Sequence, residues 1–127
     1  MTTKYKYLRI DCDNVGDKIE LCLYELDTEK AQGINNLIRQ SIAELSDNLR
    51  TLLNSEILLI GPDDILLKIE TSNIDLELLK QIKDNFYTKT GITLSIGIGE
   101  DIIGAMRNLD IAKRSGKNKI YDKWCCH

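Results

Sequence analysis

Two apolar, β-prone runs separated by a four-residue turn constrain the fold of this chain more than any other stretch. The runs span residues 57–60 and 65–69, and Gly61-Pro62-Asp63-Asp64 stands between them. Proline presets φ for the second position of a tight turn, and glycine and aspartate are common in turns. The stretch predicts a β-hairpin whose strands are largely buried and whose tip is acidic. Two carboxylates held rigidly in this way suit a divalent cation, although aspartate is also an ordinary turn residue.

Length and composition restrict the domain organisation and the possible partners of the chain. With 127 residues, 43% of them hydrophobic and 29% charged, the chain is expected to form a single domain over residues 1–127 with its core at about 5–121. No apolar run is long enough to cross a bilayer and no signal segment opens the sequence, so we expect a cytoplasmic protein without direct membrane contact. The net charge of −3 excludes a global basic field, and we expect no binding of duplex nucleic acid.

Four cysteines are present, namely Cys12, Cys22, Cys125 and Cys126. None of them forms a Cys-x-x-Cys pair, and His127 is the only histidine. Adjacent cysteines beside a histidine offer soft metal ligands, but their spacing suits a structural zinc site poorly. We expect Cys12 and Cys22 to be small buried residues.

Hydrophobic periodicity predicts the remaining elements. These are a strand over 5–12, a long helix capped at Asp27, a second helix capped within 71–73, a strand over 92–99, a helix over 102–115 and a short edge strand over 118–121. Segment 17–23 fits a helix or a strand. In the helix over 102–115 the apolar residues expected to face inward are Ile103, Met106, Leu109, Ile111 and Ala112. The order predicts an α+β fold close to the ferredoxin-like plan, with helices packed on a mostly antiparallel sheet.

Two glycines interrupt the strand over 92–99, at Gly97 and Gly99. Glycine weakens a strand and marks a place where something approaches the backbone closely. That neighbour is either a helix packed on the sheet or a ligand, and the sequence leaves both open.

A second acidic strand end accompanies the hairpin tip. Alternation in the strand over 5–12 places Asp11 at its C-terminal end, followed by Asp13. In a ferredoxin-like sheet this strand and the hairpin are neighbours, so we expect Asp11 to lie beside Asp63 and Asp64. Without a nearby cation in the sequence, three such carboxylates repel one another unless Mg²⁺ or Mn²⁺ neutralises them. Two ions about 4 Å apart would activate an attacking hydroxyl and stabilise the leaving oxygens.

The small polar loop over 13–17 adds a second component. A helix that begins in this loop would aim free backbone N–H groups at a phosphate. Lys113 and Lys117 flank the end of the last helix and offer positive charge, although lysine there is also ordinary compensation of the helix dipole. Carboxylates, amides and lysines together describe a nucleotidyl-transfer site.

Four motifs occur in order, namely Asp11-Cys12-Asp13-Asn14-Val15-Gly16, Gly61-Pro62-Asp63-Asp64, Ser95-Ile96-Gly97-Ile98-Gly99 and the basic segment over 112–118. This set resembles the palm-type nucleotidyl cyclase superfamily, which includes GGDEF diguanylate cyclases and the palm of the large subunit of type III CRISPR complexes. The chain looks most like the minimal CRISPR polymerase (mCpol) family. The resemblance extends over residues 5–121 and implies a ferredoxin-like palm domain.

Roles for individual residues follow from this resemblance. It implies that Asp11, Asp63 and Asp64 are catalytic and ligate two Mg²⁺ or Mn²⁺ ions, assisted by the backbone carbonyl of Cys12. Pro62 stands where the family usually has glycine. The resemblance also implies a nucleotide-binding set, which consists of Asp13, Asn14, Val15, Gly16, Lys113 and Lys117.

The resemblance further implies a homodimer whose two domains face each other, each holding one nucleoside triphosphate, with ATP favoured. The expected product is a cyclic di- or oligonucleotide second messenger, such as cyclic di-AMP, made in antiphage defence and sensed by a separate, often membrane-bound effector. Two alternatives remain. One is a hydrolase that resembles GTP cyclohydrolase type III, and the other is a catalytically inactive nucleotide sensor.

Overall fold

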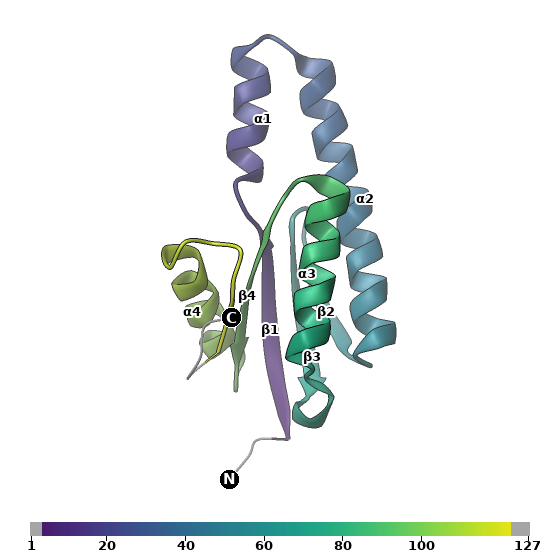
Figure 1. Cartoon of the computed structure of the whole chain (residues 1–127), viewed down its shortest axis with the longest axis vertical. Helices are drawn as coiled ribbons and strands as arrows, with labels where there is room; N and C mark the ends of the chain where they lie inside the picture. The colour runs from purple at the N-terminus through teal and green to yellow at the C-terminus, as the bar shows by residue number, and fades with distance from the viewer. Residues whose placement is uncertain (1–3, 123–127) are drawn as a thin grey trace.

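A computed structural model describes residues 4–122 of the chain (Figure 1). The elements are β1 (Tyr5–Cys12), α1 (Val15–Tyr24), α2 (Thr28–Leu52), β2 (Glu56–Ile60), β3 (Asp64–Glu70), a 3₁₀ turn (Thr71–Asn73), α3 (Leu76–Thr90), β4 (Leu94–Gly99), α4 (Ile102–Arg114) and β5 (Ile120–Tyr121). The predicted α+β class is confirmed, and segment 17–23, which periodicity left open, is helical. The Cys125-Cys126-His127 motif lies outside the described residues.

The strands form one sheet in the order β2-β3-β1-β4-β5. Within residues 4–122, β4 and β5 pair in parallel and the other neighbouring strands are antiparallel, as predicted. Strand β1 lies at the centre, where Asp11 is opposite Asp64 on β3 and Ser95 on β4. The C-terminal end of β1 therefore meets the tip of the β2–β3 hairpin.

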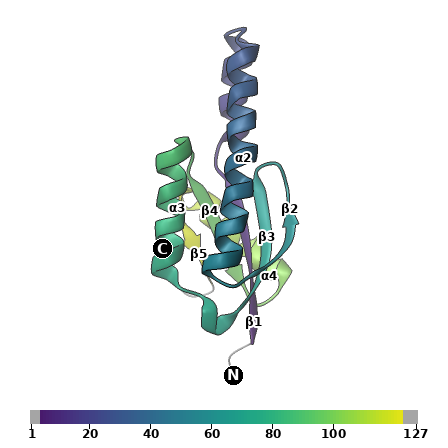
Figure 2. The same ribbon diagram turned by 90° about the vertical axis from the view of Figure 1, so that its right-hand side faces the viewer.

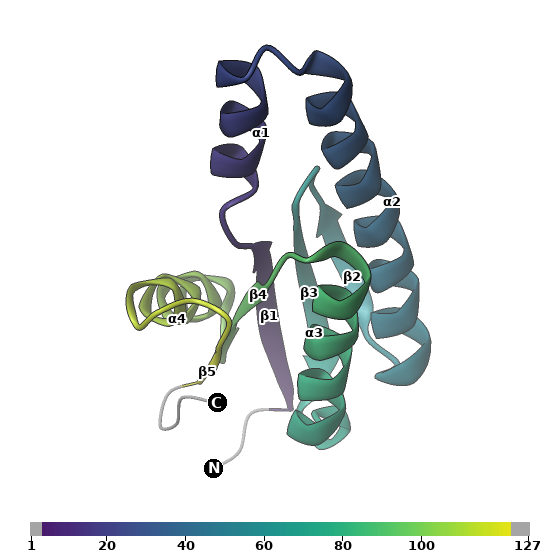
Figure 3. The same cartoon turned by 45° about the horizontal axis from the view of Figure 1, so that its top comes forward.

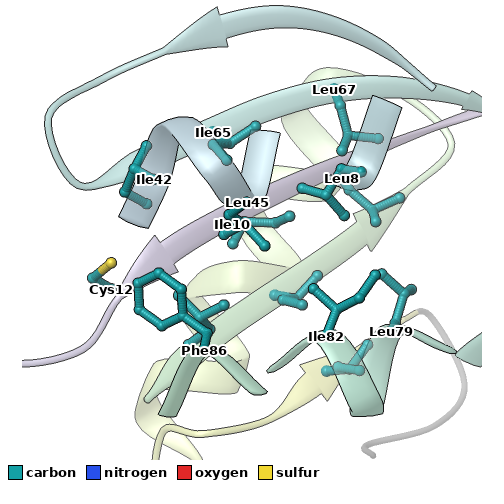
Figure 4. Packing of buried hydrophobic residues seen from close by; sticks show 14 of the residues in the cluster. Leu8, Ile10, Cys12, Ile42, Leu45, Ile65, Leu67, Leu79, Ile82 and Phe86 are labelled. Atoms are coloured by element: carbon teal, nitrogen blue, oxygen red, sulfur yellow. The ribbon is translucent and has the colours of Figure 1, made fainter. Parts of the chain in front are cut away.

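Helices cover both faces of the sheet. Figure 2 shows α2 and α3 in front of the sheet and α4 behind it, and Figure 3 shows the same separation from above. Alternation along β1 sends Leu8, Ile10 and Cys12 into the layer beneath α2 and α3, where all three are buried (Figure 4). Each apolar side chain fully buried in this layer contributes roughly 1.5–3 kcal/mol to folding.

Helix α1 and the first half of α2 extend beyond the sheet as an antiparallel pair (Figure 1). Asp27 caps α2 as predicted, because its Oδ1 accepts a hydrogen bond from the Lys30 amide at 3.0 Å. Cys22 is buried on α1, and Cys12 is buried at the end of β1, as expected for small apolar residues. Among the described residues, no helix combines the length and the apolarity that crossing a membrane requires.

The hairpin strands differ in burial. Strand β3 sends Ile65, Leu67 and Ile69 into the core. Strand β2 forms an edge of the sheet, and Leu59 is 58% and Ile60 51% exposed. The prediction of largely buried strands is therefore right for β3 and wrong for β2, because a strand at the edge has a neighbour on only one side.

The start of α3 also differs from the prediction. Residues Thr71–Asn73 form a 3₁₀ turn, and the cap is Asp75, whose Oδ1 accepts from the Leu78 amide at 3.1 Å. The 3₁₀ turn uses the polar residues that were expected to cap the helix. Helix α3 is followed by Gly91, whose φ of 73° ends the helix in the left-handed conformation.

Helix α4 lies against β4 through small residues. A Cβ atom at Gly97 would overlap the backbone at Ala105 and Leu109, and one at Gly99 would overlap the Ala105 backbone. The glycines therefore mark close helix-to-sheet packing, one of the two readings that the sequence left open.

This close packing overturns part of the expected inward face of α4, although Ala112 is buried as predicted. Ala105 and Ala112 are its buried residues, whereas Ile103 is 68% and Met106 54% exposed. The prediction was wrong for Ile103 and Met106 because a helix that touches glycine backbone presents its smallest side chains to the sheet, and these larger ones remain on the outside.

Candidate active site

Three carboxylates converge where β1 ends and the hairpin turns. Asp11 is the penultimate residue of β1, Asp63 lies in the turn and Asp64 opens β3. One carboxylate oxygen from each lies within 4.8 Å of the other two. The structure thus brings together the three residues that the sequence singled out as metal ligands.

Backbone contacts hold the turn in place. The Gly61 amide donates to the Asp64 carbonyl at 2.9 Å, and the Cys12 amide donates to the Asp63 carbonyl at 3.0 Å. A Cβ atom at Gly61 would overlap the Asp64 carboxylate. A side chain at this position would therefore move the Asp64 carboxylate from its place over the turn.

Two cations neutralise part of the cluster, contrary to the expectation that none lies nearby. Arg9 Nη2 contacts Asp64 Oδ2 at 2.5 Å, and Lys113 Nζ contacts Asp11 Oδ2 at 2.8 Å. Arg9 was missed by the sequence reasoning, although strand alternation places it on the same face as Asp11. Its target on β3 depends on strand register, which the sequence pattern does not specify.

The electrostatics single out Asp63. Its burial, together with the charges of Asp11 and Asp64, raises the pKa of the Asp63 carboxyl. Burial acts to lower the pKa of Lys113, but its hydrogen bonds to Asp11 and Asp13 and the charges of both outweigh this effect and raise it. The cluster therefore carries excess negative charge that an added cation would relieve.

The donor set fits a hard divalent cation. All three converging ligands are carboxylate oxygens, the ligand type that Mg²⁺ and Mn²⁺ prefer. Burial and the nearby carboxylates Asp63 and Asp11 raise the pKa of Cys12 to about 12, so its thiol stays protonated. The thiol also lies among the core residues (Figure 4). A role for Cys12 through its backbone carbonyl stays a prediction.

Asp13 occupies a different place from the one expected for a phosphate-binding loop. Its side chain is 1% exposed. It accepts hydrogen bonds from Thr93 Oγ1 and Ser95 Oγ, each at 2.7 Å, and from the Asn118 amide at 3.1 Å. Its own amide is engaged too, because it donates to the Thr93 carbonyl at 2.9 Å. Asp13 therefore joins β1, β4 and the turn after α4 beneath the surface of the site.

The rest of the loop matches the prediction more closely. Asn14, with φ of 62°, precedes α1, and the first intrahelical bond runs from the Lys18 amide to its carbonyl at 3.1 Å. The amides of Val15 and Gly16 come before this bond and have no partner within the helix. Asn14 makes no side-chain cap, and its Oδ1 instead accepts from Lys117 Nζ. The N-terminal end of α1, with its free amides, and the Lys117 side chain thus lie together next to the carboxylates.

The chain is similar in sequence to one protein family and in structure to several solved proteins. The sequence matches the minimal CRISPR polymerase domain (mCpol) over residues 7–122. No curated protein matches the chain significantly. Many solved structures share its fold.

Three solved structures illustrate the range. A Csm1–Csm4 cassette in complex with cA4 has a TM-score of 0.70 at 16% identity, covering 92% of this chain and 20% of that one. Csm1 from T. onnurineus has a TM-score of 0.65 at 19% identity over 94% of this chain and 20% of that one. The active GGEEF domain of a diguanylate cyclase from Vibrio cholerae has a TM-score of 0.56 at 19% identity, covering 94% of this chain and 83% of that domain.

The match thus covers nearly all of this chain but only about a fifth of each Csm1 chain. At these identities the likeness shows the fold, which is that of palm and GGDEF-type domains. The family match extends over all of the strands and helices except the first residues of β1. The chain belongs to the minimal CRISPR polymerase domain family.

Proposed function

We propose that the protein is a metal-dependent nucleotidyltransferase that joins nucleoside triphosphates, with ATP favoured, into a cyclic di- or oligonucleotide. The observation that carries the proposal is the convergence of Asp11, Asp63 and Asp64 within 4.8 Å at the C-terminal end of the central strand of a palm-type sheet. Family and fold both agree with a nucleotide polymerase or cyclase.

The carboxylates would hold Mg²⁺ or Mn²⁺, two ions per site. When bound, such ions supply Lewis acidity for the attacking ribose hydroxyl and for the pyrophosphate that leaves. Arg9 keeps Asp64 oriented through its 2.5 Å contact. Lys113 contacts Asp11 at 2.8 Å, and a cation at Asp11 would release the lysine for the negatively charged substrate.

Phosphate binding is assigned to the loop between β1 and α1. The unpaired amides of Val15 and Gly16 open α1, and a helix start attracts anions. Lys117 lies at this loop through its bond to Asn14 and adds a positive charge there. The triphosphate would therefore extend from the carboxylates across the start of α1.

A second copy completes the reaction. The chain forms a single carboxylate cluster within its described residues, and linking two nucleotides requires each to be held in reacting position. We therefore infer a homodimer with facing sites. The Csm1–Csm4 structures bound to one ATP, to pppApApA and to cA4 support nucleotide chemistry on this fold. The product would be a second messenger of antiphage defence, read by a separate, often membrane-bound effector.

Product analysis tests this proposal. The purified protein is incubated with each nucleoside triphosphate plus Mg²⁺ or Mn²⁺, and the products are identified by mass spectrometry. We expect a cyclic adenylate from ATP, no product from Asp63→Ala, and normal product from Asp47→Ala, which alters an aspartate that is 72% exposed on α2. A formylated pyrimidine from GTP would instead establish a hydrolase, and binding without turnover would establish a sensor.

A further inference from the structure

A buried lysine on α3 is connected to the site through polar contacts that the proposed reaction does not use. The side chain of Lys83 is 9% exposed, and its Nζ donates to Asn118 Oδ1 at 2.7 Å. Its other partner is Asp84, at 3.4 Å, whose side chain is 74% exposed. Burying a lysine is costly unless its ammonium group is paired. The contact with Asn118 is therefore the one that orients Lys83 inward.

Asn118 belongs to a turn with an uncommon backbone. After α4, Gly116, Lys117 and Asn118 have φ values of 116°, 64° and 54°. Two consecutive non-glycine residues in the left-handed region each cost on the order of 1 kcal/mol and persist only where their surroundings hold them. Such strain is concentrated at functional sites.

The surroundings hold this turn at two points. The Lys117 amide donates to the Ala112 carbonyl at 3.1 Å, which closes the end of α4. The Asn118 amide donates to the buried carboxylate of Asp13 at 3.1 Å, while its side chain accepts from Lys83. Asn118 is thus fixed through both its backbone and its side chain.

The left-handed turn after α4 determines where the Lys117 side chain lies. Its ammonium group reaches Asn14, which is 103 residues away in the sequence and also has positive φ, at 62°. A rotation of the turn into the ordinary right-handed region would carry Lys117 away from the loop that precedes α1. The turn conformation, and not the length of the lysine side chain alone, places this charge.

We propose that Lys83 is a positioning residue: by holding Asn118 in the left-handed region, it keeps Lys117 at the site where the terminal phosphates of a nucleoside triphosphate bind. The inference rests on the proposed function, because it assigns the ligand of that site. It adds a residue on α3 that the sequence motifs do not include. Lys83 acts through Asn118 and Lys117 and does not touch the substrate.

Binding measurements separate positioning from simple stabilisation. We compare the dissociation constants of a non-hydrolysable ATP analogue and of AMP for the full chain and for Lys83→Met, which keeps the apolar stem and removes the donor. We expect about tenfold weaker binding of the triphosphate, the effect of one charged hydrogen bond, and unchanged binding of AMP. Lys80→Met, at a lysine with a 40% exposed side chain on the same helix, is the matched control and should bind both ligands normally.

A double-mutant cycle with Lys117→Ala gives the sharper test. If Lys83 acts through Lys117, then Lys83→Met causes no further loss once Lys117 is alanine. Additive losses, or unchanged triphosphate binding by Lys83→Met, would overturn the inference. Asn118→Gly tests the same contact if Lys83→Met does not fold, because glycine keeps the backbone conformation and removes the acceptor.

The same measurements distinguish failure of this inference from failure of the proposed function. A wild-type protein that binds the triphosphate analogue no better than AMP contradicts the proposed function, and the inference falls with it. Normal discrimination by the wild type together with normal discrimination by Lys83→Met overturns the inference alone.

Discussion

Lys117 and Asn14 meet through a side-chain hydrogen bond, although they are 103 residues apart and both lie in the left-handed region of φ. Two strained turns, one before α1 and one after α4, therefore face each other beside the carboxylates. Asp13 connects the same two turns from below, since it follows β1 directly and accepts from the Asn118 amide. The loop before α1 and the turn after α4 form one unit, which explains how a chain this small can order a polar site.

Because the pKa of Asp63 is raised, replacing its carboxylate with a neutral side chain should stabilise the folded protein, by an amount that depends on pH. Because the folded protein binds this proton more tightly than the unfolded chain, the stability of the wild type falls as pH rises from the ordinary value of 3.8 through the raised folded pKa. Asp63→Asn cannot titrate. We expect its melting temperature to exceed that of the wild type at pH 7 in low salt, with the difference shrinking as pH falls through the raised folded pKa toward 3.8.

The control for this prediction is Asp47→Asn, whose side chain is 72% exposed beside Arg50. It should melt within a degree or two of the wild type, as surface substitutions usually do. An Asp63→Asn protein whose difference from the wild type does not change with pH would contradict the assigned cause.

Divalent cations should stabilise the wild type. Saturating Mg²⁺ or Mn²⁺ relieves the repulsion among Asp11, Asp63 and Asp64, and binding to the folded state raises the melting temperature by mass action. Removing Asp63 should abolish the effect. Thermal denaturation with and without the metal measures the stabilisation of the wild type and of the variant. The electron paramagnetic resonance signal of Mn²⁺ measures the binding of the metal itself. An Asp63→Asn variant that gains as much from Mn²⁺ as the wild type does would exclude this cluster as the site.

Close packing of α4 predicts a strong effect at Gly97. A methyl group there overlaps the backbone at Ala105 and Leu109, so Gly97→Ala should cost roughly 1–3 kcal/mol of folding free energy. The displaced helix carries Lys113, and activity should fall with stability. Chemical denaturation measures the cost. Gly33→Ala is the matched control: nothing lies within 4 Å of its added methyl group in α2, and it should stabilise by up to about 1 kcal/mol.

The buried carboxylate of Asp13 predicts a structural penalty when it is replaced by an amide. Asp13→Asn must turn an NH₂ group toward either the Asn118 amide or Lys113, both of which are donors. Leaving such a buried donor unsatisfied should cost about 1–3 kcal/mol. Urea denaturation gives the value. A loss below about 0.5 kcal/mol would mean that the hydrogen bonds to Asp13 contribute little.

The sequence predicted the parts of this structure that depend on local patterns. The hairpin, the long helix capped by Asp27 and the placement of Asp11 beside the hairpin tip all followed from alternation, turn residues and chain order. These features are determined within a few residues or by the common order of strands in a ferredoxin-like sheet.

The parts that the sequence did not predict depend on contacts between distant segments. Arg9 pairs with Asp64 only because β1 and β3 have a particular register. The burial of Asp13 and the role of Lys83 depend on how the turn after α4 folds beneath the loop before α1. The exposed face of α4 could not be predicted from its apolar residues, because the glycines of β4 determine which side of the helix touches the sheet.

Pyrophosphate release is the direct measure of nucleotidyl transfer at the carboxylate cluster. The wild-type protein and Asp63→Asn are incubated with ATP and Mg²⁺ under conditions in which both are folded, and released pyrophosphate and orthophosphate are measured separately. We expect one pyrophosphate for each nucleotide joined by the wild type, and none from Asp63→Asn. Equal release by both proteins, or release of orthophosphate alone, would contradict nucleotidyl transfer at the carboxylate cluster.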